Sequence, residues 1–329
     1  MKMTQSGRNS AKCRIGFVGT GGVATRHARI LGDFADVQLV AATDVVPERA
    51  RAFADDHGMA AARDVDALLA HSLDALYVCI PPFAHGPVEH GLLGSGLPLF
   101  IEKPPAVDLE TAERISAAFT ERSTLTRVGL HWRLGEPVRR ARKLLAGRTV
   151  RLVHGTWLDK VPPVAWWTDP TRSGGQVVEQ AVHVLDLARV LVGEVREVTA
   201  AAGPPVVPGG IASATAALLR FDGGALGTLA TTCALSWKSQ VGLRVVADDV
   251  VVDVNEESVQ LTDPTGTRRW TADPHDARVA ADRAFVNAVR GVDGKDAGAD
   301  LPDYAEAVRS HRLACAVARA VTSGVGERP

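Results

Sequence analysis

Residues 13–24 read CRIGFVGTGGVA, a short apolar run that leads into a glycine-rich turn. The turn fits the pattern G-x-G-x-x-A, and a segment of helical character follows it to about Gly32. Gly19 permits a tight turn, Gly21 lets the backbone approach a pyrophosphate, and Ala24 allows a helix to pack closely on a sheet. The phosphates would lie at the helix N-terminus, where free N–H groups and the helix dipole favour anions. A strand before the turn and a helix after it are the context that a dinucleotide site requires.

Apolar strand-like runs and helical segments alternate through the first part of the chain. The strand-like runs are residues 13–18, 37–43, 74–80, 98–104 and 126–131. Because continuous apolar strands that alternate with helices form parallel sheets covered on both faces, we expect an α/β fold of the Rossmann type here. The expected division is a disordered tail at 1–12, a Rossmann dinucleotide-binding domain at 13–125, and a second domain at 126–329.

The second part of the chain has a different pattern. A helix is predicted for 174–193, and several strand-like runs separated by turn residues fill 195–271. Two more helices are predicted near 275–291 and 303–323. These segments predict an α+β domain with a large, mostly antiparallel open sheet.

Composition limits the classes of partner. The 329 residues include 37 Lys plus Arg and 38 Asp plus Glu, so the net charge is −1, which argues against a nucleic-acid partner bound through a broad basic field. No apolar run approaches the ~20 residues of a membrane-spanning helix. The four cysteines are far apart, without a CxxC or Cys/His cluster, which favours buried free thiols and no metal site. The polar N-terminus lacks the apolar core of a secretory signal, so a cytoplasmic location is expected.

Asp44 follows the second strand-like run, 20 positions after Ala24. A carboxylate there can accept hydrogen bonds from both ribose hydroxyls of NAD, and it would repel the 2′-phosphate of NADP. The alternative is a solvated residue that caps the next helix, but together with the glycine turn the cofactor interpretation is favoured. Nearby Arg49 could offset the repulsion, so NAD is the expected cofactor and NADP stays open.

The loop after the third strand-like run contains Pro81, Pro82, Phe83 and His85. Ligands bind at the C-terminal ends of the strands in parallel sheets, so Phe83 and His85 could line the nicotinamide–ribose region. The alternative, held equally, is a loop whose prolines only end the strand.

Lys103 stands in the sequence Glu102-Lys103-Pro104, at the end of the next strand and on the same edge. The chain has 30 Arg and only 7 Lys, so a lysine at this position is notable. A lysine can donate a proton, and an apolar pocket lowers its pKa, whereas Arg stays charged. The alternative is an ordinary exposed lysine, which its place between an apolar strand and prolines makes less attractive.

Glu179, His183 and Asp186 lie in the helix predicted for 174–193. Their spacings of four and three residues put them on one helical face. A single histidine on such a helix is more often a core residue than a catalyst. Three polar groups in register would each need a buried partner, which makes a purely structural role less attractive.

In this order and spacing the motifs resemble those of the glucose–fructose oxidoreductase/inositol dehydrogenase (Gfo/Idh/MocA) family. The matching stretches are GTGGVA at 19–24, TD at 43–44, CIPPFAH at 79–85, IEKP at 101–104 and GGQVVEQAVHVLD at 174–186. The resemblance implies NAD- or NADP-dependent oxidation of a sugar or polyol alcohol, or reduction of the corresponding ketone. It also implies that Lys103 is the catalytic lysine and His183 the histidine that transfers the proton.

The chain departs from the family pattern at Glu179, because the family usually has Asp four residues before the histidine. The additional methylene would move the carboxylate by roughly an ångström, which is enough to change substrate fit or rate. We expect Glu179 to orient His183 or to bind a substrate hydroxyl, and we place it with Lys103 and His183 among the catalytic residues.

Two sets of binding residues follow from the motifs and the resemblance. The residues expected at the cofactor are Gly19, Thr20, Gly21, Gly22, Val23, Ala24, Asp44, Pro81, Phe83, His85, Glu102 and Lys103. The residues expected at the substrate are Lys103, Trp132, Arg133, Trp157, Trp166, Arg172, Glu179 and His183. Tryptophan rings can stack on the C–H faces of sugars, and the alternative for them is core packing or a subunit interface.

The leading functional hypothesis is an NAD(P)-dependent dehydrogenase or reductase that acts on a sugar, cyclitol or sugar derivative. The alternative is a non-catalytic, nucleotide-sensing regulator on the same fold, which typically lacks the lysine or the histidine that this chain has. The resemblance further implies a homodimer or homotetramer, in which a second subunit covers the open sheet. The apolar residues expected on that face are Leu218, Phe221, Leu226 and Leu229.

Overall fold

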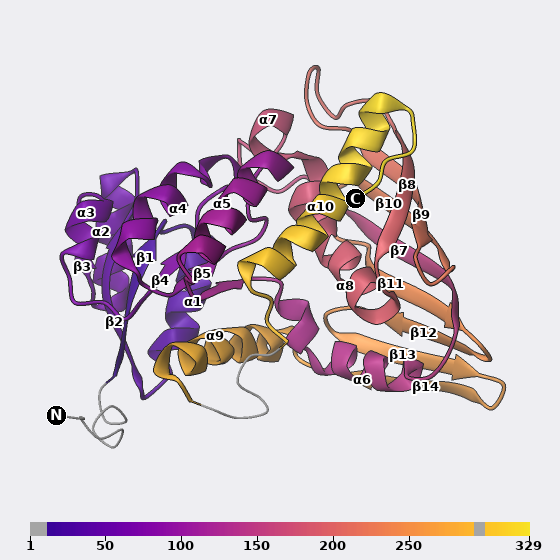
Figure 1. The fold of residues 1–329 in the computed structure, drawn as a ribbon, viewed down its shortest axis with the longest axis horizontal. Coiled ribbons are helices and arrows are strands. Elements are labelled where there is room, and N and C mark those ends of the chain that lie inside the picture. The colour runs from indigo at the N-terminus through magenta and orange to yellow at the C-terminus, as the bar shows by residue number, and fades with distance from the viewer. Residues whose placement is uncertain (1–11, 293–299) are drawn as a thin grey trace.

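The computed structural model describes residues 12–292 and 300–329, and it contains two sheets flanked by helices (Figure 1). Of the tail expected at 1–12, only Lys12 falls within the described residues. Sheet A is parallel throughout, with the strand order β3-β2-β1-β4-β5-β6. Its strands are β1 (Cys13–Val18), β2 (Val37–Thr43), β3 (Ala60–Ala61), β4 (Ala75–Val78), β5 (Leu99–Ile101) and β6 (Thr126–Val128).

Helices pack on both faces of sheet A, because its strands are apolar on both faces. Tyr77 of β4 belongs to the same core cluster as Ala24, whereas its neighbour Leu76 belongs to another core cluster with Ile115. The helices of this part are α1 (Gly22–Gly32), α2 (Pro47–His57), α3 (Val65–Leu69), α4 (Pro87–Leu92) and α5 (Leu109–Glu121). The parallel α/β fold predicted from the alternating runs is confirmed.

Helix α9 (Pro274–Arg290) comes from the C-terminal part of the chain but packs on sheet A. Its Phe285 ring lies 5.4 Å from the ring of Tyr77 and 5.6 Å from that of Phe100. Strand β6 pairs with β5, so sheet A continues beyond residue 125, where the domain division was expected. The nucleotide-binding part therefore includes β6 and is completed by a helix from far along the chain.

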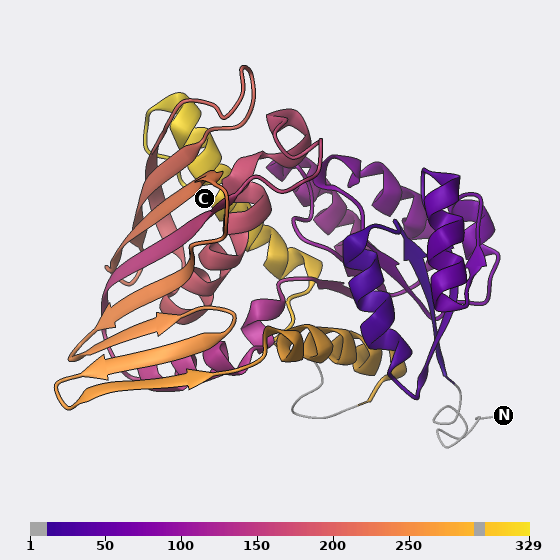
Figure 2. The ribbon, with the colours of Figure 1, turned by 180° about the vertical axis from the view of Figure 1, so that it is seen from behind.

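Sheet B is antiparallel except for the parallel pair of β7 and β10, in the order β14-β13-β12-β11-β7-β10-β9-β8. Its strands are β7 (Val150–Lys160), β8 (Val195–Ala202), β9 (Ala214–Phe221), β10 (Leu226–Leu235), β11 (Gln240–Ala247), β12 (Val250–Val254), β13 (Ser258–Asp263) and β14 (Gly266–Thr271). One face is covered by α6 (Glu136–Leu145), α8 (Val182–Val192) and α10 (Tyr304–Ser323), which lie between this sheet and the nucleotide-binding part (Figure 2). The other face is open, as predicted.

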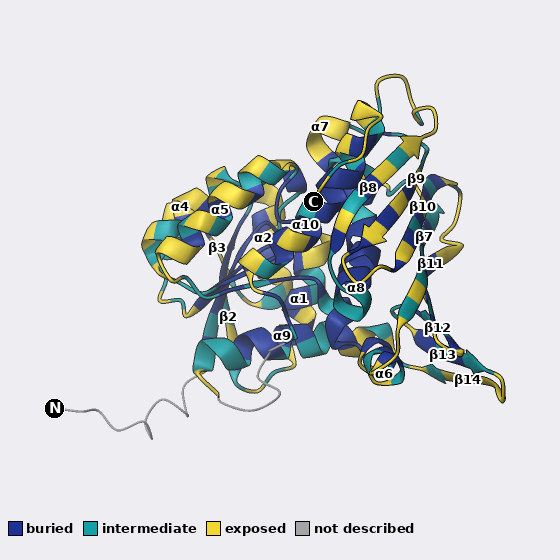
Figure 3. Cartoon of the chain, turned by 45° about the vertical axis from the view of Figure 1, so that its right-hand side comes forward, coloured by how far each residue is buried: buried dark blue, intermediate teal, exposed yellow. Residues whose placement is uncertain are grey.

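The four apolar residues expected on the open face are divided between the two faces, and this part of the prediction is wrong. Phe221 and Leu229 are each 1% exposed and lie in the covered core, whereas Leu218 and Leu226 are 38% and 42% exposed. Side chains alternate along a strand, so residues three positions apart point to opposite faces. The resulting alternation of buried and exposed residues is visible along β9 and β10 (Figure 3).

The helix predicted for 174–193 is interrupted. After the short helix α7 (Pro170–Ser173), Gly174 and Gly175 have φ values of 73° and 85°. A π-helical turn (Val177–Ala181) then precedes α8. Because a π turn contains an additional residue, it changes the direction of the side chains before it relative to those after it. Across residues 12–292 and 300–329, no helix combines the length and apolar character needed to cross a membrane.

Candidate active site

The glycine-rich turn between β1 and α1 leaves room for a ligand. Gly19 has a φ of 87°, and a Cβ there would lie 2.3 Å from the carbonyl oxygen of Cys79, so only glycine fits. A Cβ on Gly21 or Gly22 would meet no atom within 4 Å, and no side chain caps the start of α1. The start of α1 is therefore open, with no side chain on its N–H groups, and it fits the pyrophosphate of a dinucleotide.

Asp44 lies just beyond the end of β2, beside the glycine-rich turn. Its Oδ2 accepts hydrogen bonds from the backbone N–H and the hydroxyl of Thr20, at 2.9 and 3.0 Å. Its Oδ1 accepts one from the N–H of Val46 at 2.9 Å. The carboxylate is thus held at the turn, in the position that the ribose interpretation requires.

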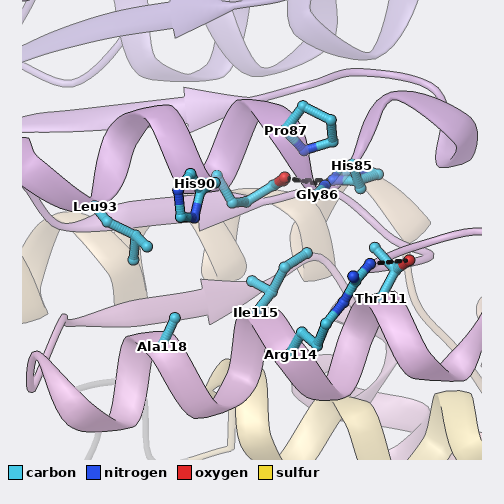
Figure 4. A pocket seen from close by; sticks show the side chains of 10 residues that line it. His85, Gly86, Pro87, His90, Leu93, Thr111, Arg114, Ile115 and Ala118 are labelled. Carbon is cyan, nitrogen blue, oxygen red and sulfur yellow. Dashed lines mark hydrogen bonds and ion pairs between the residues drawn. The ribbon is translucent and has the colours of Figure 1, made fainter.

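The loop after β4 sends its side chains in two directions. The Phe83 ring lies 6.3 Å from the ring of Trp166 and 4.0 Å from the guanidinium carbon of Arg172. Three residues expected in the site are thereby brought together, and they join the Rossmann edge to the segment before α8. His85 instead lies 2.6 Å from Glu89, with its side chain fully buried. It lines a cavity of about 470 Å³ between α4 and α5 (Figure 4), and its place at the nicotinamide stays a prediction.

Lys103, directly after β5 and Glu102, contacts Glu179 of the π turn. Its Nζ donates to both Glu179 Oε1 and the Glu179 carbonyl oxygen, each at 2.7 Å. The other carboxylate oxygen of Glu179 accepts a hydrogen bond from the indole N–H of buried Trp167 at 2.7 Å. The contact between Lys103 and Glu179 was not predicted: Glu179 was expected to orient His183 or to bind a substrate hydroxyl, whereas its carboxylate oxygens bond to Lys103 and Trp167.

The ring of His183 packs beside two tryptophans that also pack against each other, with 5.9 Å between the centres of Trp132 and Trp157. The His183 ring lies 5.2 Å from Trp132 and 6.1 Å from Trp157, with interplanar angles of 14° and 17°. The third ring in contact, His131, is 5.4 Å away at 73°. Trp132 and Trp157 are only 3% and 7% exposed, so they shape the surroundings of His183 more than they present a free surface.

The electrostatic surroundings of His183 favour the neutral imidazole. Burial holds its pKa well below the usual value, and the positive charges of Lys103, His131, Arg26 and Lys238 lower it further. Nδ1 is buried without a hydrogen-bond partner among the described residues, which leaves Nε2 as the nitrogen that can meet a substrate. A neutral imidazole can accept a proton at neutral pH.

Arg133 and Asp186 are not where the sequence led us to expect them. Arg133 is 6% exposed, and its guanidinium donates to both oxygens of Asp186, at 2.7 and 2.5 Å, and to Glu306 at 3.1 Å. Asp186 also accepts a hydrogen bond from the Ser310 hydroxyl at 2.6 Å. Because of the π turn, Asp186 points in another direction than Glu179. Arg133 and Asp186 therefore form a buried structural pair and are not part of a substrate pocket.

Two residues that contact members of the site were missed. Trp167 is the partner of Glu179, whereas the substrate set contained its neighbour Trp166. Lys238, in the loop between β10 and β11, places its Nζ 5.7 Å from the ring centre of Trp157. The scarcity of lysine that drew attention to Lys103 applies equally to Lys238 and could have identified it.

Comparison with known proteins identifies the family and the fold. Residues 13–130 match the model of an oxidoreductase family with an NAD-binding Rossmann fold, and residues 138–251 match the GFO/IDH/MocA C-terminal domain. The chain therefore belongs to the Gfo/Idh/MocA family of oxidoreductases. Its first domain is an NAD-binding Rossmann domain, as predicted.

Two relatives are similar to the chain in sequence, and two solved structures are similar to it in fold. Inositol 2-dehydrogenase of Rhizobium meliloti is 31% identical over 186 residues, which are 55% of this chain and 55% of the relative, so the match spans about half of each. Myo-inositol 2-dehydrogenase of Thermotoga maritima is 26% identical over 270 residues, 78% of this chain and 80% of the relative. A levoglucosan dehydrogenase complex with NADH and levoglucosan has a TM-score of 0.83 at 17% identity, covering 96% of this chain and 99% of that one. An oxidoreductase from Agrobacterium radiobacter in complex with NAD+, L-tartaric acid and magnesium has a TM-score of 0.82 at 16% identity, covering 97% and 98%. At these identities the solved structures establish the fold.

Proposed function

We propose that this protein is an NAD-dependent dehydrogenase that oxidises a secondary alcohol of a sugar, cyclitol or sugar derivative, or reduces the corresponding ketone. The observation that carries this proposal is the group formed by Lys103, Glu179 and His183. The ammonium of Lys103, which the Glu179 carboxylate holds, lies at the C-terminal edge of sheet A together with the neutral imidazole of His183. The glycine-rich turn opens at the same edge.

These side chains can perform complementary proton chemistry. Bound NAD would supply the acceptor for the hydrogen on the substrate carbon. Lys103 would hydrogen-bond the substrate oxygen and stabilise the negative charge that develops on it. Neutral His183 would take the hydroxyl proton through Nε2, and in the reverse direction the protonated ring would return it. Glu179 would hold the ammonium of Lys103 in place, and Trp167 would hold Glu179.

The choice of cofactor and substrate follows from neighbouring residues. Asp44, held by Thr20 and Val46, favours the ribose hydroxyls of NAD over the phosphate of NADP. Phe83 and Trp166 offer ring faces for the C–H surface of a sugar, and Arg172 offers donors for its hydroxyls. The Rhizobium and Thermotoga relatives are named as inositol dehydrogenases, which supports a polyhydroxylated substrate.

The test is a Lys103→Ala variant assayed with NAD and a panel of polyols and sugars through NADH absorbance. Removing the group that stabilises the oxyanion should lower kcat by about 10²–10⁴-fold and leave the Kd for NADH within about threefold. Lys143→Ala is the matched control, because Lys143 is an exposed lysine on α6. Near-normal turnover by Lys103→Ala on a confirmed substrate would refute the assignment. Cofactor binding by the wild type without turnover on the whole panel would favour the regulator.

The open face of sheet B is the surface at which we expect a second copy to bind. Leu218 on β9 and Leu226 on β10 are exposed there, on the face opposite α8 and α10. Large apolar side chains on an uncovered sheet face are typical of a protein–protein interface. A homodimer or homotetramer would bury them.

A further inference from the structure

The imidazole of His27 is buried on the sheet side of α1 and lies between two carboxylates. Its Nδ1 is 2.7 Å from Asp282 Oδ1, and its Nε2 is 2.9 Å from Glu102 Oε1. The side chains of His27, Asp282 and Glu102 are 4%, 0% and 8% exposed. A carboxylate accepts hydrogen bonds, so both ring nitrogens must donate, and this requires the doubly protonated imidazolium.

The three residues join separate parts of the chain to Lys103. His27 is in the helix that begins at the glycine-rich turn, and Asp282 is in α9. Glu102 uses its second oxygen to accept the backbone N–H of Lys103 at 3.1 Å. A Cβ on Gly129 would lie 2.7 Å from Glu102 Oε1, so the backbone of Gly129 packs closely against this carboxylate. Glu102 therefore has little room to move away from His27.

Each element packed around His27 contributes a charged or titratable group to its surroundings. Asp282 faces it from α9 and Glu102 from the end of β5, while Arg26 of α1 lies 4.0 Å from Glu102. Tyr77 of β4 donates its hydroxyl to Asp282 at 3.1 Å, and burial raises the pKa of that hydroxyl well above its usual value. Burial by itself lowers the pKa of His27, but Asp282 and Glu102 outweigh it and raise the pKa to about 9.

We propose that His27 is a positioning residue for the lysine of the active site: its fixed imidazolium holds Glu102, and Glu102 holds the backbone of Lys103 relative to the dinucleotide-binding helix. The effect on turnover rests on the proposed function, whereas the charge and the tie to Lys103 do not. A lysine whose backbone is free to shift by about an ångström loses much of its effect, because catalysis depends on position at that scale.

The sign of the pH dependence follows from the raised pKa. The imidazolium contributes stability fully below the unfolded value of ~6.5, and this contribution is lost as the pH rises through about 9. Above that pH one ring nitrogen loses its proton, and the hydrogen bond to Asp282 or Glu102 is lost with it. The buried proton should therefore remain through the range in which most histidines titrate.

The first experiment is ¹⁵N NMR of the whole protein labelled at histidine, with the His27 signals assigned by their loss in His27→Gln. Both ring nitrogens should show the protonated signature from pH 6 to about pH 8. In Glu102→Gln, an isosteric change that retains the packing, the His27 pKa should fall by at least about one unit, and the Lys103 amide resonance should shift. A ring that titrates near the ordinary ~6.5 would overturn the proposal.

The second experiment separates positioning from packing. His27→Gln and Glu102→Gln should each lower kcat by about 10- to 100-fold while KM changes by less than about threefold. His90→Gln, at an exposed position on α4, is the matched control. Wild-type kcat in a folded Glu102→Gln variant would overturn the positioning role. If the wild type turns over no substrate, the proposed function fails, while the NMR result and the Lys103 amide shift still decide the proposal.

Discussion

Replacement of Arg133 by methionine distinguishes a structural ion pair from a substrate contact. In the structure the guanidinium makes two hydrogen bonds to Asp186 and one to Glu306, and its side chain is 7% exposed. Asp186 is 1% exposed, and within the part of the chain that the structure describes it would keep only the Ser310 hydroxyl as a side-chain donor after the change. The variant therefore leaves a buried carboxylate without its counter-ion.

The expected cost is about 3–5 kcal/mol in the free energy of unfolding, because an uncompensated buried charge is far more costly than a lost surface contact. For a domain of this size, that corresponds to a fall in Tm of about 6–20 °C. Thermal unfolding followed by circular dichroism measures it. A double variant, Arg133→Met with Asp186→Asn, should recover most of the loss, since it removes the remaining charge.

Arg139→Met is the control, because Arg139 is a half-exposed arginine whose nearest carboxylate, Glu136, is 3.8 Å away. An exposed pair of this kind should change the free energy of unfolding by less than about 1 kcal/mol. The reasoning is refuted if Arg133→Met unfolds within about 1 °C of the wild type and instead raises KM. Arg133 would then be a substrate residue, as first expected.

Two further predictions concern the cofactor and the assembly. Asp44→Ala should weaken NAD binding by about 10- to 100-fold, which corresponds to the loss of a charge-assisted hydrogen bond, and should weaken NADP binding much less. Isothermal titration calorimetry with both dinucleotides measures the two Kd values. An unchanged ratio of these values would show that Asp44 does not select between NAD and NADP. Leu226→Glu, on the open face of sheet B, should convert an oligomer to a monomer in multi-angle light scattering, whereas a wild type that is already monomeric at micromolar concentration would contradict the expected interface.

The strands and helices could be predicted because their signals are local. The run CRIGFV and the turn that follows it depend on residues within a few positions, and each forms as expected. The alternation of side chains along a strand is also a local property. The separation of three residues between Leu218 and Phe221 could therefore have shown that they point to opposite faces of the sheet. The role of α9 could not, because nothing in its own sequence shows that Phe285 contacts Tyr77.

The places of Lys103 and Asp44 at the ends of their strands could be predicted from the motifs, and that of Glu179 from the helical pattern, whereas their roles stay predictions. The site could not be predicted where a side chain finds a partner far along the chain. Arg133 follows Trp132 in a 3-10 turn (His131–Leu134), and only the packing of that turn against α6, α8 and α9 directs the guanidinium to Asp186. The π turn likewise has no sequence signal of its own, although it determines which way Glu179 faces.

The departure from the family pattern at residue 179 has a geometric explanation. One carboxylate oxygen of Glu179 is 2.7 Å from Lys103 and the other is 2.7 Å from Trp167, so both ends of the carboxylate are held. An aspartate on the same backbone would be roughly an ångström too short to make both hydrogen bonds. An ammonium has three N–H donors, and Glu179 accepts two of those of Lys103 through its carboxylate and its carbonyl oxygen. The longer acid therefore fixes the direction of the one remaining donor, and that donor is the one available to a substrate oxygen.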